Sequence, residues 1–226
     1  MSIGWLTCIP AVLLPHSLCR FTTANAPANR QMPIASVVRG KPKKKNMELY
    51  EIDNLLAKTR TDLESLIEKY EFIPQFQFIL NEEIDYSIID TLNYSGIYLI
   101  EIKTPHESYD IVQWANEFRD LWEKPEYKDK FVPNIKKKRL DFHSELVEWF
   151  PIYIGKSSLI KRRIKEHLNL KLSKPTTALK LLERTNIYGT EFRISTMNIT
   201  VKNYDLIVSE FENYFREKIN PILGRK

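Results

Sequence analysis

The sequence predicts an α+β fold, in which a small central β-sheet is flanked by helices and preceded by a helical extension. Two segments rich in Ile, Tyr and Leu, GIYLIEIK at 96–103 and FPIYIGK at 150–156, have the length and composition of strands. A third segment, EFRISTMNI at 191–199, alternates apolar and polar side chains, as a strand with one buried face does. We expect these three strands to share one sheet, because helical patterns fill most of the chain around them.

Five segments carry apolar residues at the spacing of an amphipathic helix. They cover about 48–70, 107–123, 158–170, 176–185 and 203–218. Ser157 or Ser158 is expected to cap the third of these helices. Before the first strand, FQFIL at 76–80 suggests a short extended piece after Pro74, and we expect residues 47–93 to pack as a helical extension.

The formal net charge of +5 and the pI of 9.0 are properties of the N-terminal segment. Residues 1–46 contain seven basic residues and no acidic one, whereas the remaining 180 residues contain 27 basic and 29 acidic ones. The composition changes directly after Met47, so the segment is interpreted as a disordered basic tail or as a start assigned too early. Being free of acids and containing arginine, it also resembles an organellar presequence. Its apolar run, broken by Pro10 and Pro15, is too short to span a membrane and lacks the basic start of a signal peptide.

The overall composition is that of a globular protein, with 43% hydrophobic and 12% aromatic residues among 226. Its two cysteines, Cys8 and Cys19, both lie near the N-terminus, so the body has neither a disulfide framework nor a cysteine cage for a metal. We therefore expect a cytoplasmic protein, or an organellar one if residues 1–46 are a presequence.

The helix predicted over 158–170 places two charged or titratable side chains on its apolar face. Successive steps of about 100° gather its apolar residues on one arc, Leu159, Ile160, Ile164 and Leu168. Arg163 and His167 fall on the same arc, four residues apart. Burying an unpaired guanidinium is costly, so this edge borders a pocket, or Arg163 meets a carboxylate, or it extends along the domain edge to water. A histidine beside an arginine is expected to have a lowered pKa and to be neutral.

The tripeptides GIY at 96–98 and YIG at 153–155, with Arg163 ten residues after Tyr153, resemble the GIY-YIG nuclease domain. That family includes homing endonucleases, some restriction enzymes and the N-terminal nuclease of the bacterial excinuclease C subunit. The segment FENYFREKINPIL at 211–223 resembles the family's next element, and the likeness covers roughly residues 94–226. It implies a divalent-metal-dependent DNA endonuclease, a hydrolase of phosphodiester bonds that uses Mg²⁺ or Mn²⁺ and has DNA as its partner.

The resemblance also implies roles for single residues. Tyr98 and Tyr153 correspond to the two motif tyrosines of the active site, and Arg163 to the arginine that engages the scissile phosphate. His167 matches a histidine that many members have four residues after that arginine. Glu212, nine residues before the proline of the last element, corresponds to the single carboxylate that holds the metal. Such a site suits a hard cation, which takes oxygen ligands and keeps several waters.

The residue that activates water is left open among three candidates. His167 is one, and the two tyrosines Tyr98 and Tyr153 are the others; we favour a tyrosine, with His167 assisting. For DNA contact, Lys156 resembles the lysine of the excinuclease and of some restriction enzymes. Two basic clusters add candidates for contact with the DNA backbone, namely Lys136, Lys137, Lys138 and Arg139 in the first and Lys161 and Arg162 in the second.

Two features depart from the family pattern. The tripeptides are separated by 54 residues, far more than in the family's compact hairpin, so residues 104–149 are an insertion that we expect over the site or on DNA. Many members carry an asparagine after the proline, at a spacing that falls on Gly224 here. Periodicity alone would also allow Glu210 as the inward carboxylate of the last helix, and His106 and His143 show no metal-ligand spacing.

Two other functions remain as alternatives. The chain could be a non-catalytic nucleic-acid-binding module derived from the same fold. It could also be an interaction protein in which Arg163 and Glu212 form only a structural salt bridge.

Overall fold

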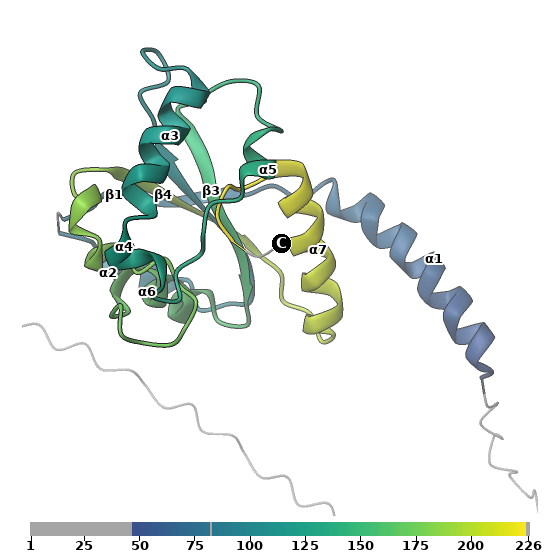
Figure 1. Cartoon of the computed structure of the whole chain (residues 1–226). Coiled ribbons are helices and arrows are strands. Elements are labelled where there is room, and N and C mark those ends of the chain that lie inside the picture. The colour runs from purple at the N-terminus through teal and green to yellow at the C-terminus, as the bar shows by residue number, and fades with distance from the viewer. Residues whose placement is uncertain (1–46, 82, 225–226) are drawn as a thin grey trace, which may run out of the picture. The chain divides into compact units, whose positions relative to one another are not determined.

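The computed structural model describes residues 47–81 and 83–224 of the chain, so the interpretations of residues 1–46 lie outside the described residues. Its centre is a four-stranded antiparallel sheet with helices packed against it (Figure 1). The strands, in the spatial order β1-β4-β2-β3, are β1 (Ile73–Ile79), β2 (Gly96–Lys103), β3 (Trp149–Ser157) and β4 (Glu191–Asn198). The predicted α+β class and the single sheet are confirmed.

Seven α-helices and two 3₁₀ turns surround the sheet within the described ranges. They are α1 (Leu49–Ile67), α2 (Tyr86–Thr91), α3 (Ile111–Trp122), α4 (Pro125–Lys128), α5 (Lys137–Leu140), α6 (Ile160–Asn169), α7 (Tyr204–Ile219), η1 (Leu181–Glu183) and η2 (Thr185–Ile187). None of the helices in residues 47–224 combines the length and the apolar character needed to cross a membrane.

The prediction of a helix over 176–185 is wrong. The structure has irregular backbone up to Lys180, which adopts a left-handed conformation with φ of 55°, and then the short 3₁₀ turns η1 and η2. Contacts from distant residues hold this shape: Lys180 Nζ donates hydrogen bonds to the carbonyls of Lys130, Leu172 and Lys174. Tertiary contacts thus override the local helical spacing.

The start of α6 also differs from the prediction, because Leu159 and not a serine is the N-cap residue. The Ser157 hydroxyl instead accepts a hydrogen bond from the Leu159 N–H at 3.1 Å, one residue before the helix. Ser157 closes the turn between β3 and α6 and leaves the first helical N–H groups to other partners.

Residues 47–93 are not only a helical extension. Their extended piece is β1, which pairs with β4 along the edge of the central sheet. Phe76 and Phe78 of β1 are buried in the main core, so this part of the chain belongs to the same folding unit as the later strands. Helix α1, in contrast, has only Ile67 buried.

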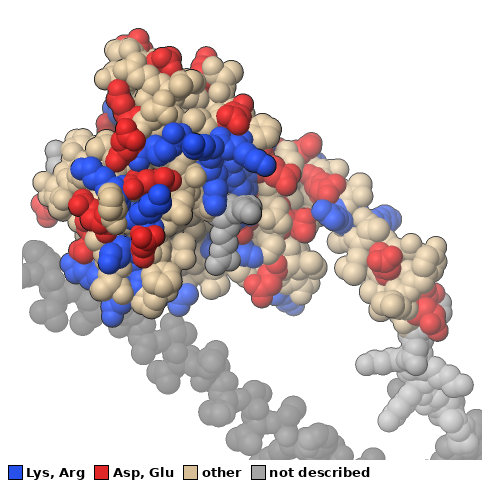
Figure 2. Space-filling view, viewed as in Figure 1, with Lys and Arg blue, Asp and Glu red and all other residues tan. Residues whose placement is uncertain are grey.

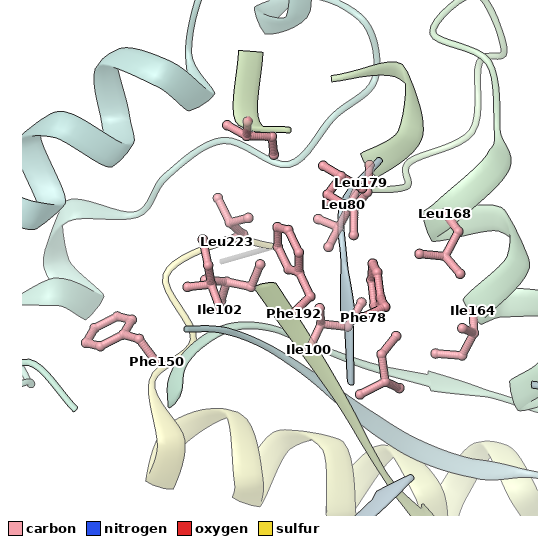
Figure 3. Close-up of a cluster of buried hydrophobic side chains, with 14 of the residues drawn as sticks. Phe78, Leu80, Ile100, Ile102, Phe150, Ile164, Leu168, Leu179, Phe192 and Leu223 are labelled. Carbon is pink, nitrogen blue, oxygen red and sulfur yellow. The ribbon is translucent and has the colours of Figure 1, made fainter. Parts of the chain in front are cut away.

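Alternation along β2 divides the core into two layers. Tyr98, Ile100 and Ile102 face one side, where they meet α3 and α6, and Ile97 and Leu99 face the other, where α7 covers them. Figure 3 shows the first layer, with its side chains on the side of the sheet opposite α7.

The long connection between β2 and β3 is part of the same core. Its helix α3 contributes Trp114 and Phe118 to the main cluster, and the Trp122 indole donates to the carbonyl of Pro133 at 2.8 Å. The segment after it covers the C-terminal residues, since the Lys136 N–H donates to the Ile222 carbonyl at 2.8 Å. These C-terminal residues in turn pair with the outer edge of β3, which protects that edge from solvent.

Candidate functional site

One cleft of about 640 Å³ collects most of the residues that the sequence singles out. Its walls come from β2, β3, α6 and α7, with Pro133 and Thr177 from two loops. Of the predicted site residues, five line it: Tyr98, Tyr153, Lys156, Arg163 and Glu212. Pro133 is the one residue of the insertion in the lining, and the helix of the insertion, α3, packs in the main core instead. The expectation that the insertion lies over the site is therefore not confirmed for α3.

The pairing of β2 with β3 places the two tyrosines side by side. Tyr98 lies opposite Gly155 and Tyr153 opposite Ile100, so both side chains leave the same face of the sheet. Their rings lie with centroids 6.1 Å apart. A Cβ atom at Gly155 would lie 2.7 Å from the Tyr98 ring carbon that carries the hydroxyl, and 3.0 Å from the Tyr153 ring. The glycine of YIG therefore provides the space in which Tyr98 lies.

The glycine of GIY has a similar role against the backbone. A Cβ atom at Gly96 would overlap the carbonyl oxygen of Met197 and lie 3.0 Å from the Ile199 nitrogen. Both partners are backbone atoms of β4 and the residue just after it, which cannot move aside without breaking the pairing of β2 and β4. Each tripeptide thus needs its glycine for close packing.

Arg163 faces inward on α6, as the helical projection predicts, with its side chain 19% exposed. Its Nε donates to the Tyr98 hydroxyl oxygen at 3.3 Å, Nη1 pairs with Glu166 at 2.6 Å, and Nη2 donates to the Thr177 carbonyl. Burial acts to lower the pKa of Arg163, but Tyr98 and Glu166 outweigh it and the pKa lies above its ordinary value. The guanidinium is therefore a permanent cation held in a fixed plane.

His167 is fully buried one helical turn further on. Its Nδ1 accepts a hydrogen bond from the Leu179 N–H at 3.1 Å, so in the neutral ring the proton is on Nε2, which lies 2.8 Å from the Tyr98 oxygen. Burial, and then the charge of Arg163, lower the pKa of His167 well below 6.5. The neutral histidine is as predicted, but both ring nitrogens are engaged, which argues against His167 as the direct acceptor of a proton from water.

Two N–H donors converge on the Tyr98 oxygen, one from His167 and one from Arg163. Burial, and then the neighbouring Tyr153, raise the pKa of Tyr98 well above 10. The phenol is therefore neutral at rest, although its surroundings supply the hydrogen bonds that a phenolate would need.

On the opposite wall, α7 presents Glu212 to the cleft, paired with Arg216 one turn later. Arg216 also donates to the Asn213 side-chain oxygen at 3.3 Å. Glu210 lies elsewhere and pairs with Arg60 at 3.7 Å, so the choice of Glu212 as the cleft carboxylate agrees with the structure. Arg163 and Glu212 have separate partners, Glu166 and Arg216, and the alternative in which they form a salt bridge is not supported.

The other predicted cations divide into two groups. Lys156 lies in the cleft and its ammonium donates to the Ser209 hydroxyl of α7. Lys161 and Arg162 lie on the outer side of α6, outside the cleft lining, and pair with Asp90 at 3.6 Å and with Glu166 at 3.8 Å. The structure thus does not bring the second basic cluster to the site.

The first basic cluster, Lys136 to Arg139, forms α5 and the residue before it. Arg139 Nη1 donates to the Pro221 carbonyl at 3.2 Å, which ties α5 to the end of α7. Figure 2 shows basic side chains gathered over α5 and beside the C-terminal end of the described chain. Gly224, the position at which the family pattern has an asparagine, lines the cleft close by.

The residues of the cleft fit a hard divalent cation through Glu212. Mg²⁺ commonly uses one or two protein carboxylates and completes its shell with waters and phosphate oxygens. Within residues 47–224 as described, no group of three or more His, Cys, Asp or Glu side chains could hold a metal ion. In the cleft, Glu212 and the amide of Asn213 are oxygen-bearing side chains on the α7 wall that could face such a cation. Glu212 already binds one cation, the Arg216 guanidinium.

Three contributors to the site were missed at the sequence level. Thr177 and Leu179 act through their backbone, and no side-chain pattern marks them. Arg216 could have been found, because it follows Glu212 by four residues, the spacing at which opposite charges meet on a helix.

No protein-family model, no curated protein and no solved structure matches this chain. The chemistry of the site therefore follows from its own geometry. Two phenols, the guanidiniums of Arg163 and Arg216, an ammonium and one carboxylate face a common space. This set can bind a polyanion through its cations and a hard cation through its carboxylate.

Proposed function

We propose that the chain is a divalent-metal-dependent DNA endonuclease that hydrolyses phosphodiester bonds in this cleft, with a GIY-YIG active site. One observation carries the proposal: residues from four separate elements, all named by the resemblance, line the same cavity. They are Tyr98, Tyr153, Lys156, Arg163 and Glu212. A structural role alone would not require these particular groups to share one solvent-filled space.

Arg163 binds the scissile phosphate in this mechanism. Glu166 and the Thr177 carbonyl fix the plane of its guanidinium, so little side-chain entropy is lost when the phosphate arrives. Lys156 adds a second cation on the β3 side of the cleft. The lysines of α5 add contacts to the DNA backbone that do not depend on sequence.

Tyr98 is assigned as the proton acceptor in its phenolate form: the phenol, neutral at rest, first loses its own proton to solvent, and the phenolate then takes a proton from the attacking water. The His167 Nε2–H and the Arg163 Nε–H both reach its oxygen, so they stabilise the phenolate relative to the phenol. His167 assists by position, since the Leu179 N–H fixes its tautomer. A Mg²⁺ or Mn²⁺ ion held by Glu212 would supply positive charge for the phosphate and for the leaving 3′-oxygen.

Nicking of supercoiled plasmid by the full chain, with Mg²⁺ or with EDTA, tests the proposal. We expect nicking with Mg²⁺ and none with EDTA, and a loss of about 100-fold or more in Arg163→Ala and in Glu212→Gln. The matched control is Glu210→Gln, two residues away on the same helix and paired with Arg60 outside the cleft, which should keep wild-type activity.

Two results would overturn the assignment: a wild type that does not cut, or undiminished cutting by both Arg163→Ala and Glu212→Gln. Binding of DNA without cutting would favour the non-catalytic nucleic-acid-binding module instead.

A further inference from the structure

Helix α1 leaves most of its apolar side chains in solvent. Leu49 is 80% exposed and Leu56 52% exposed, and Ile52, Leu55 and Leu66 are exposed as well. The helix meets the other described elements along its C-terminal half, where Arg60 pairs with Glu210 of α7. In the same half, Leu63 packs against the core layer under α7 and Ile67 is buried in it. Figure 1 shows its earlier turns without a neighbouring element among the described residues.

An isolated helix of this kind needs a partner. At 19 residues α1 is near the length at which a lone helix is marginal in water, and most helical stability in proteins comes from packing an apolar face. A row of exposed leucines on one face is also larger than the scattered apolar residues of an ordinary surface. The row is therefore interpreted as an unfilled contact surface.

The spacing of the row indicates what fills it. Apolar residues follow one another at alternating steps of three and four, with a single threonine in the series: Leu49, Ile52, Leu56, Thr59, Leu63 and Leu66. This is the heptad pattern, in which every first (a) and fourth (d) position is apolar, and such a seam packs against another seam of the same period. The same helix in a second copy of the chain provides such a seam.

The charges of α1 argue against other occupants. Four acidic and two basic residues give Leu49–Ile67 a net negative charge, which disfavours DNA or an anionic membrane on this surface. The charges also choose an orientation. Asp53 and Arg60 both occupy e positions beside the seam, and in an antiparallel pair the e positions of the two helices face each other.

We propose that α1 pairs with α1 of a second copy in an antiparallel coiled coil. In the register that aligns Leu49 with Leu66 of the second copy, Asp53 lies beside Arg60 of the second copy, and the two-fold symmetry repeats this ion pair. A parallel pair would place Arg60 beside Leu55 and gain no such pair. The Arg60 side chain is 67% exposed, so it can reach across by exchanging its surface ion pairs with Glu64 and Glu210 for the one with Asp53. This interface does not depend on the proposed nuclease activity.

Sedimentation of the full chain between about 1 and 100 µM tests the pairing, because a dimer must dissociate on dilution. We expect a dimer in the wild type, and in Leu56→Glu a dissociation constant raised about 100-fold, since one buried leucine is lost from each copy. The matched control is Leu206→Glu, an equally exposed leucine of α7 at 58%, which should leave the dimer intact. Far-ultraviolet circular dichroism and thermal melting confirm that both variants fold.

Exchange of the charges tests the orientation. Asp53→Lys and Arg60→Glu alone should each weaken the dimer about two- to tenfold, and the double variant should restore it. A dimer that the single changes weaken but the double variant does not restore would overturn the antiparallel register.

A wild type that is monomeric over the whole range, or a dimer that persists in Leu56→Glu, would overturn the proposal. A monomer whose melting temperature falls in Leu56→Glu but not in Leu206→Glu would assign the occupant to another segment of the same chain and would overturn it as well.

Discussion

The two walls of the cleft are held in different ways. On the α6 side, hydrogen bonds join residues far apart in the sequence: Tyr98 meets Arg163 and His167 across 65 and 69 positions, and the Leu179 N–H fixes the histidine from a loop. On the α7 side, Glu212 takes its partner from the same helix, four positions away. One wall is therefore built by the tertiary fold and the other by a single helix.

This difference indicates that the two walls have separate functions. The α6 wall cannot rearrange without disturbing β2, α6 and the loop at 177–179, so it is suited to hold the phosphate and the proton acceptor in place. On the α7 wall, a metal ion could replace the Arg216 guanidinium at Glu212 without breaking a contact to another helix or strand. Substitutions should therefore cost stability on the first wall and change ligand affinity on the second.

Gly155→Ala should have the largest effect, because it displaces Tyr98, to which Arg163 and His167 of α6 are hydrogen-bonded. The new Cβ would lie 2.7 Å from the Tyr98 ring, so either Tyr98 or the pairing of β2 with β3 must shift. We expect a loss of about 1–3 kcal/mol of unfolding free energy, as for other overpacked sites. Nicking should fall about 100-fold, since a displacement near 1 Å at the acceptor is enough for that loss. Urea unfolding and the plasmid assay measure the two effects; wild-type values in both would show that Tyr98 adapts.

His167 should make the stability of the protein depend on pH. Burial and Arg163 lower the pKa of His167 well below 6.5 in the folded state, whereas the unfolded chain takes up a proton near that value. Below about pH 6.5 the unfolded state therefore binds more protons, and stability falls by up to about 1.4 kcal/mol per pH unit. Urea unfolding at about pH 7.5 and 5.5 should show this loss in the wild type and a smaller one in His167→Gln.

The control for this measurement is His106→Gln, which changes an exposed histidine and should keep the wild-type dependence on pH. An unchanged slope in His167→Gln would mean that another group carries the effect and that the histidine is not held neutral by the fold.

The same contrast between local and tertiary contacts separates what the sequence could predict from what it could not. The inward position of Arg163 and His167 follows from helical periodicity. Periodicity left Glu210 and Glu212 open, and the resemblance, through its spacing to Pro221, favoured Glu212. These features depend on spacing within one segment, so they are visible in a short stretch of sequence.

The errors fall where distant residues decide the structure. The segment at 176–185 has a helical pattern, but carbonyls such as that of Lys130, from the insertion, accept hydrogen bonds from Lys180 and hold another shape. Arg184 is stacked on the Trp122 ring at 3.6 Å, a second contact with the insertion. The pairing of β1 with β4 joins strands more than a hundred residues apart, and no local pattern specifies such a partner.

Arg216→Ala should have the smallest effect on stability and a clear effect on metal binding. The Glu212–Arg216 pair is part-buried, with side chains 14% and 18% exposed, but the guanidinium lines the cleft. We therefore expect its loss to cost about 1 kcal/mol and to lower the melting temperature only slightly. The guanidinium occupies a Glu212 oxygen, and a divalent cation must compete with it. Its removal should tighten Mn²⁺ binding about two- to fivefold in calorimetry or in Mn²⁺ electron paramagnetic resonance without DNA, while Glu212→Gln should abolish binding.

The control is Arg162→Ala, which removes an ion pair of the same spacing, with Glu166 on α6 and outside the cleft lining, and should leave Mn²⁺ affinity unchanged. Weaker binding in Arg216→Ala would mean that the guanidinium positions the carboxylate for the metal and does not compete with it. In that case Arg216 would hold Glu212 in place, as His167 holds Tyr98. The two walls would then differ only in how far apart in the sequence the interacting residues lie.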